Sequence, residues 1–194
     1  MTTVPLTTDL AAPEGWATGT WTIDPVHTSV AFSVRHLMSR IRGSFSDVTG
    51  QIVTDHSPSR CHVTATAALS SVNTGNPMRD DHLRSADFFD IEHTPEMSFS
   101  STALRPAGAA GAGWVLTGDL TIRRTTRPVE LQLEFLGVDP AGLQGETRIG
   151  FAAHGAIRRR DFGITFGLAA DGSRVVGDKV DITLDVEAVL DVEG

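Results

Sequence analysis

The sequence predicts an all-β protein built from antiparallel strands. Apolar and polar side chains alternate with a period of two along several separate stretches, most clearly at residues 180–187, where Val180, Ile182 and Leu184 alternate with charged or polar residues. Successive side chains on a strand point to opposite faces of a sheet, so each stretch is interpreted as a strand with one buried face. Burial on one face only is typical of antiparallel rather than parallel sheets.

The first predicted strand covers residues 21–36. Four apolar residues share its buried face: Val26, Val30, Phe32 and Val34. A turn at residues 40–43 is expected to lead into a second strand at residues 44–53, which carries Phe45. The third strand, residues 62–69, alternates apolar with polar residues and ends at Leu69.

The alternation then stops, and a short helix is predicted at residues 78–88. Asn76 can cap such a helix, Pro77 can open it, and the two aspartates that follow suit its positive N-terminal end. Leu83, Phe88 and Phe89 supply its apolar contacts. The segment is long enough to lie across one end of a barrel, and Pro95 ends it.

The remaining strands fill the C-terminal half of the chain. Phe99 belongs to the fourth strand, the fifth and sixth are joined at residues 123–128, the seventh covers residues 147–157, and the eighth covers residues 179–190. Pro128 falls early in the sixth strand, a position that an edge or a bulge tolerates. About eight amphipathic strands favour closure into a barrel, because closure removes exposed edges. Such a barrel has room for packed side chains or one ligand.

The bulk properties indicate one domain, residues 19–194, after a flexible extension at residues 1–18 that only Trp16 could hold in place. A formal net charge of -8 and a pI of about 5.2 argue against nucleic acid as a partner. The single cysteine excludes an internal disulfide. No Lys or Arg precedes Arg35 and no long apolar run is present, so we expect no signal peptide, no transmembrane segment and a cytoplasmic protein.

Candidate catalytic and metal-binding groups are few. The densest ionisable cluster comprises Arg79, Asp80, Asp81, His82, Arg84 and Asp87. Helix capping and pairing between neighbours explain it better than acid–base catalysis, and no nucleophile motif is present. The seven histidines show no close ligand spacing, so neither a metal nor a cofactor is expected. His27 beside Asp24 favours a structural hydrogen bond, and Cys61 is interpreted as a small structural residue.

Five motifs in chain order resemble the YceI-like family. They are W-x-I-D-x-x-H at residues 21–27, G-x-F-x-x-V-x-G at 43–50, R-D-x-H-L-x-S-x-D-F-F-D at 79–90, L-T-I-R with R-P at 120–128, and R-x-D-F-G at 159–163. The resemblance implies an extended, lipocalin-like barrel, usually a homodimer, whose elongated pore holds a long polyisoprenoid or similar amphiphile. The resemblance also implies that many relatives carry a secretion signal, which we do not expect in this chain.

The resemblance and the strand parity, meaning which face of its strand each alternate residue occupies, together predict a lipid-binding site in the pore. The residues expected to hold an apolar tail are Phe32, Val34, Phe45, Leu69, Phe99, Leu120, Ile122, Leu133, Phe135, Phe151, Phe162 and Leu184. Arg79, His82 or Arg159 would meet the polar head at one mouth. Small inward residues such as Ala65, Ala67, Gly118 and Ala153 would leave space.

Two alternatives stay open at this point. One is an enzyme that acts on a small amphiphilic substrate with Arg79, His82 and Asp87 in its site. The other is a barrel with a filled core that acts through protein contacts on its outer faces.

Overall fold

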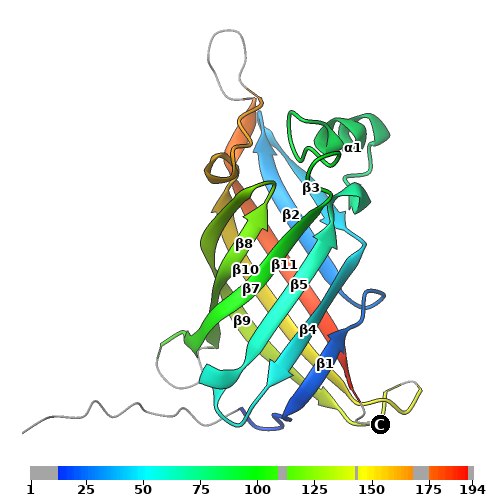
Figure 1. Cartoon of the computed structure of the whole chain (residues 1–194), viewed down its shortest axis with the longest axis vertical. Coiled ribbons are helices and arrows are strands. Elements are labelled where there is room, and N and C mark those ends of the chain that lie inside the picture. The colour runs from blue at the N-terminus through cyan, green and yellow to red at the C-terminus, as the bar shows by residue number, and fades with distance from the viewer. Residues whose placement is uncertain (1–12, 109–112, 143, 168–174, 192–194) are drawn as a thin grey trace, which may run out of the picture.

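The computed structural model describes residues 13–108, 113–142, 144–167 and 175–191. They form an elongated antiparallel barrel with one short helix, α1 (Pro77–Arg84), beside one end (Figure 1). The strands are β1 (Gly19–Ile23), β2 (Ser29–His36), β3 (Ser39–Phe45), β4 (Val48–Thr54), β5 (His62–Ala68), β6 (Val72–Asn73), β7 (Glu96–Pro106), β8 (Trp114–Ile122), β9 (Thr125–Asp139), β10 (Arg148–Arg158) and β11 (Val176–Leu190). In these residues no helix has the length and apolar character needed to cross a bilayer.

The barrel closes as a ring of eight strands, as the sequence predicts. The order is β1-β4-β5-β7-β8-β9-β10-β11, and β11 pairs again with β1. β11 is long enough to pair with two strands along the same edge. Its first part, from Val176 to Asp185, pairs with β2, and its last residues, from Ala188 to Leu190, pair with β1. The β2–β3 hairpin and β6 therefore extend the wall beyond β1 and β4 at the α1 end (Figure 1).

The predicted first strand is wrong in one respect, because residues 24–28 interrupt it. The backbone N–H of Val26 donates to Asp24 Oδ1 at 2.9 Å, which closes a tight turn. Val26 is 83% exposed, although the alternation placed it on the buried face. The Asp24-Pro25 pair is the signal for the break, since aspartate and proline suit the first two positions of a turn.

The first hairpin turn also lies earlier than expected, at Leu37 and Met38 rather than at residues 40–43. His36 pairs with Ser39 in the ladder, and Leu37 takes a positive φ of 51°. Leucine is an unusual residue at such a φ, so the sequence carries no turn signal here. The second predicted strand accordingly begins in β3 at Ser39 and is broken between Phe45 and Val48.

The helix forms where the sequence predicts and ends sooner. Asn76 caps it by accepting the backbone N–H of Arg79 at 3.1 Å, and Pro77 is its first residue. The helix ends at Arg84, four residues before the predicted end. The chain then makes turns that bring Phe88 and Phe89 onto the end of the barrel beside Leu83.

Pro128 lies at a locally unpaired edge, as predicted. On one side it faces Asp119 of β8, whereas the ladder between β9 and β10 extends only to the pair of Leu131 with Gly155. Beyond that pair β10 leads into the 3-10 helix η3 (Arg159–Phe162), where the sequence predicted an irregular connection.

The end of the barrel opposite α1 is filled by a compact core. Trp21, Ile149 and Ala188 are fully buried there, and Trp21 Nε1 donates to Thr54 Oγ1 at 2.8 Å. Trp16 covers this core, and its Nε1 donates to the Asp55 carbonyl at 3.0 Å. Of the predicted flexible extension, residues 1–12 lie outside the described residues.

Candidate ligand cavity

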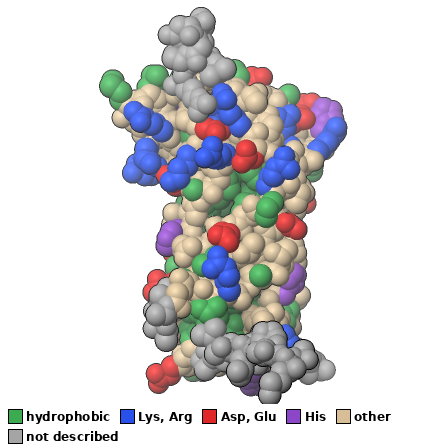
Figure 2. Space-filling view, turned by 90° about the vertical axis from the view of Figure 1, so that its left-hand side faces the viewer, with side chains coloured by type: hydrophobic (Ala, Val, Ile, Leu, Met, Phe, Trp, Pro, Cys, Tyr) green, Lys and Arg blue, Asp and Glu red, His purple; other side chains and the backbone are tan. Residues whose placement is uncertain are grey.

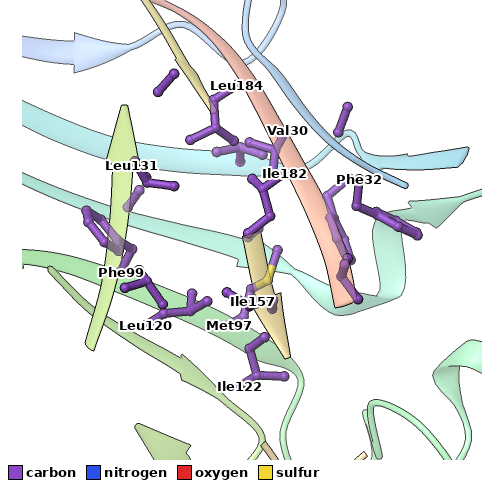
Figure 3. Close-up of a pocket in the computed structure, with 18 of the residues that line it drawn as sticks. Val30, Phe32, Met97, Phe99, Leu120, Ile122, Leu131, Ile157, Ile182 and Leu184 are labelled. Atoms are coloured by element: carbon purple, nitrogen blue, oxygen red, sulfur yellow. The ribbon is translucent and has the colours of Figure 1, made fainter. Parts of the chain in front are cut away.

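A cavity of about 750 Å³ lies between the filled end of the barrel and α1. Figure 3 shows its apolar walls, to which β2, β7, β8, β9, β10 and β11 contribute the labelled side chains. The lining residues of β11 run from Val176 to Val186. At about 3.3 Å per residue this gives a length of about 30 Å along the strand. The cavity is therefore long, apolar and of a size found for small-molecule sites.

Small residues in the wall keep the interior hollow. A Cβ at Gly43 would lie 2.5 Å from Phe32 Cζ, and one at Gly118 would lie 2.3 Å from Phe99 Cζ. Both phenyl rings therefore lie close against a glycine of a neighbouring strand. Ala65, Ala67 and Ala153 also line the cavity, as predicted, and add little volume to it.

Most of the predicted pore residues line this cavity. They are Phe32, Val34, Phe45, Phe99, Leu120, Ile122, Leu133, Phe151, Leu184, Arg79, His82 and Arg159. The prediction omitted further lining residues that Figure 3 labels, namely Val30, Met97, Leu131, Ile157 and Ile182. Strand parity could have found these, because each shares a face with a residue that was included.

Three predicted residues do not line the cavity. Leu69 is fully buried in the wall, where it packs with Phe45 and Val72. Phe135 faces inward but packs on Trp16 and Phe151 within the filled end, with ring centroids 5.2 and 5.8 Å away.

The third of these residues, Phe162, is 2% exposed and packs with Phe88, Ile122 and Ile164 around η3. It lies on a 3-10 helix rather than on a strand, so strand parity could not place it.

Two polar side chains of α1 reach the mouth of the cavity. Arg79 donates from Nε to Thr74 Oγ1 at 2.7 Å and from a terminal nitrogen to the Thr74 carbonyl at 2.9 Å. His82 Nε2 lies 2.9 Å from Asp87 Oδ2, and its ring meets Phe88 and Phe166 edge-on at 5.1 and 4.7 Å. An imidazole between two phenyl rings forms a mainly apolar rim.

Arg159 lines the cavity but is 5% exposed and anchored in the wall. Its guanidinium donates to the carbonyls of Gly177, Ile164 and Val176 at 2.8, 3.1 and 3.1 Å. These bonds tie the segment after β10 to the start of β11. Arg159 therefore has a structural role at the mouth.

The paired groups at the filled end are structural as well. His27 Nδ1 lies 2.8 Å from Asp24 Oδ2, as the sequence predicts, and a terminal nitrogen of Arg148 donates to the same oxygen at 2.8 Å. The hydrogen bonds of His27 and Arg148 hold the pKa of the Asp24 carboxyl well below its usual range.

The chemistry of the remaining polar groups is limited. Burial raises the pKa of the Cys61 thiol, so the thiolate is disfavoured at neutral pH. In the described parts of the chain, no group of three or more His, Cys, Asp or Glu side chains is placed to hold a metal ion.

The fold and the cavity together define a class: a closed, eight-stranded antiparallel barrel of the lipocalin-like type around an elongated apolar cavity. The YceI-like domain model matches residues 21–188. The chain belongs to this YceI-like family, as the sequence motifs indicated.

Three known proteins illustrate the relationship. A UPF0312 protein of Serratia proteamaculans is 35% identical over 172 residues, which are 87% of this chain and 81% of that protein. The crystal structure of BcnA from Burkholderia cenocepacia has a TM-score of 0.71 at 24% identity and covers 86% of this chain and 99% of its own.

The third is a polyisoprenoid-binding domain from Saccharophagus degradans. Its structure has a TM-score of 0.65 at 16% identity and covers 90% of this chain and all of its own. The BcnA structure and the Saccharophagus degradans structure are 24% and 16% identical to this chain, and at such low identity they are evidence for the shared fold alone.

Proposed function

We propose that this protein binds a long-chain isoprenoid or a comparable amphiphilic lipid in the barrel, and that it sequesters or carries that lipid. The observation that carries the proposal is the hollow, apolar interior, about 750 Å³ in volume and closed at one end by the Trp21 core. The polyisoprenoid-binding relative from Saccharophagus degradans supports the same ligand class.

The energetics favour a long apolar tail. Each methylene removed from water contributes about 0.8 kcal/mol, so a chain of about 20 carbons gains on the order of 16 kcal/mol. Association and ordering cost about 4–15 kcal/mol, which leaves tight binding within reach. The nine predicted apolar residues that line the cavity would contact this tail, with Arg79 and His82 near its polar head.

Binding is favoured over the enzymatic alternative. Arg79 donates two hydrogen bonds to Thr74, and the His82 ring packs against Phe88 and Phe166. Both side chains thus have structural partners, and the similar structure from Saccharophagus degradans is that of a polyisoprenoid-binding domain. Loss of a substrate turnover in His82→Ala, with the fold intact, would instead favour catalysis.

The direct experiment is native mass spectrometry of the freshly purified protein, followed by organic extraction. We expect one long-chain lipid per chain, and the same spectrum measures the predicted homodimer. A bare chain mass, with extracts no richer than those of a control protein, would argue against a lipid carrier.

A pair of matched variants then tests whether the lipid occupies the cavity. Ala153 lines the cavity, whereas its neighbour Ala152 on β10 does not. Ala153→Phe should fill space and weaken the binding of N-phenyl-1-naphthylamine, an uncharged fluorophore that brightens in apolar sites. Ala152→Phe should bind the fluorophore like the parent protein. If both variants lost fluorophore binding to the same extent, the cavity would be excluded as the binding site.

A further inference from the structure

Charge is distributed unevenly along the barrel. We call the α1 end the mouth face: the surface formed by the β2–β3 turn, α1, the β8–β9 turn, η3 and the first residues of β11. Within the described ranges, every Arg and Lys lies in one of these elements or within a few residues of it in the chain, except Arg60, Arg105 and Arg148. Figure 2 shows the basic side chains gathered over the upper part of the molecule. The same end also carries acidic residues, and Arg40, Arg84, Arg123, Arg160 and Lys179 pair with some of them. The charge that this end can offer to a partner is therefore that of the arginines without an ion pair.

Several arginines of the mouth face form no ion pair. Among the described residues, no carboxylate lies within 4.0 Å of the guanidinium groups of Arg42, Arg124 and Arg158, all three of which are exposed. Their positive charge is therefore available to an external anion. Arginine suits phosphate particularly well, because its planar group can donate two parallel hydrogen bonds.

The same face exposes large apolar side chains. Met38 is 98% exposed, Met78 84%, Leu37 58% and Phe166 44%. Hydrogen bonds and ring contacts connect their segments: Leu37 N donates to the Val175 carbonyl, Val175 N donates to the Gly167 carbonyl, and the Phe166 ring meets His82 of α1. The four apolar side chains therefore project from adjoining segments around the cavity opening.

We propose that the mouth face docks on the surface of an anionic lipid bilayer. Unpaired arginines would bind lipid phosphates while Leu37, Met38, Met78 and Phe166 enter the boundary between head groups and acyl chains. Basic residues combined with protruding apolar ones suit this partner, whereas a purely polar polyanion would gain nothing from the apolar side chains. Docking places the cavity opening against the membrane. The proposal rests on the proposed function, since it explains how a bound lipid enters or leaves.

Vesicle co-sedimentation tests the docking. We expect the protein to sediment with vesicles of phosphatidylcholine and phosphatidylglycerol in equal amounts, to remain in solution with phosphatidylcholine alone, and to be released by added salt. Arg42→Gln, Arg124→Gln and Arg158→Gln combined should weaken binding on the order of a hundredfold, since each basic residue contributes about fivefold at an anionic surface. Met38→Ser with Met78→Ser should also weaken it.

Matched controls lie away from the mouth face. Arg105→Gln removes an exposed arginine next to the last residue of β7, and Val26→Ser removes an exposed apolar side chain near the filled end. Both controls should bind anionic vesicles like the parent protein. Equal binding to both kinds of vesicle, or equal weakening in the controls, would overturn the proposal.

A second readout separates this proposal from the proposed function. N-phenyl-1-naphthylamine binding without vesicles measures the cavity alone. If the parent protein binds the fluorophore but no vesicle, the docking proposal fails and the cavity proposal stands. If it binds vesicles but no fluorophore, the cavity proposal fails. If the mouth-face variants instead shift the native mass from dimer to monomer and no vesicle is bound, the face is an interface between copies and the docking proposal is overturned.

Discussion

Gly43→Ala should push a phenyl ring into the cavity and weaken ligand binding. The new Cβ would lie 2.5 Å from Phe32 Cζ, whereas ordinary contacts begin at 3.4 Å, so the ring must move by about 1 Å. Its other close neighbour is the Thr74 methyl group at 2.8 Å, which is also a side chain. The open side for the ring is the cavity that Phe32 lines.

The size of the effect follows from the space that the ring takes. Displacing about two methylenes of a bound chain costs about 1.6 kcal/mol, which is roughly a tenfold loss of affinity. The free energy of unfolding should fall by less than the roughly 1–3 kcal/mol typical of overpacking, because the ring has a void to enter. Displacement of N-phenyl-1-naphthylamine by geranylgeraniol measures the affinity, and urea unfolding measures the stability.

The control is Gly150→Ala, the same change in β10. There the new Cβ would meet Leu136 Cβ at 3.5 Å, an ordinary contact, and Gly150 does not line the cavity. We expect parental affinity from this variant. Unchanged affinity in Gly43→Ala, or an equal loss in Gly150→Ala, would refute the reasoning that the glycine keeps the cavity open.

Three further predictions concern stability and reactivity. Because hydrogen bonds lower the folded-state pKa of Asp24, its carboxylate stabilises the fold above pH about 4, and this contribution is lost as the pH falls further. Urea unfolding should therefore show a stability gap between the parent and Asp24→Asn that narrows at acidic pH; a constant gap would contradict this. Leu69→Ala should lower the free energy of unfolding by about 2–5 kcal/mol, since Leu69 is fully buried. Cys61 should react slowly with iodoacetamide at neutral pH and faster after unfolding, and equally fast alkylation in both states would show an accessible thiolate.

The sequence was sufficient for features that depend on local chemistry. Alternation along the chain predicted the amphipathic strands themselves, and Asn76 with Pro77 predicted where α1 begins. It also predicted the bond between His27 and Asp24. In each case a short-range rule decides the outcome, because the participating groups are neighbours in the chain.

Features that depend on distant contacts could not be predicted in this way. The turn at Leu37 and Met38 has no turn-forming residues, so its position is set by pairing along β2 and β3. Alternation predicts that Phe135 faces the barrel interior. It does not predict the position of Phe135 along the barrel axis, which is at the filled end, where Trp16 packs on its ring. The hollow interior depends on Gly43 lying beside Phe32, a cross-strand register that one sequence does not specify.

The closure of the ring has a consequence for the kinetics of folding. Trp21, in the middle of β1, pairs with Leu190 at the end of β11, so the ring closes only when the two ends of the domain meet. Such distant pairing raises the contact order, which predicts slow folding. During synthesis β1 and β2 leave the ribosome long before β11, their shared partner, and they remain unpaired on that edge until β11 has been made. The last strand of the barrel is thus the one that protects the first two from aggregation.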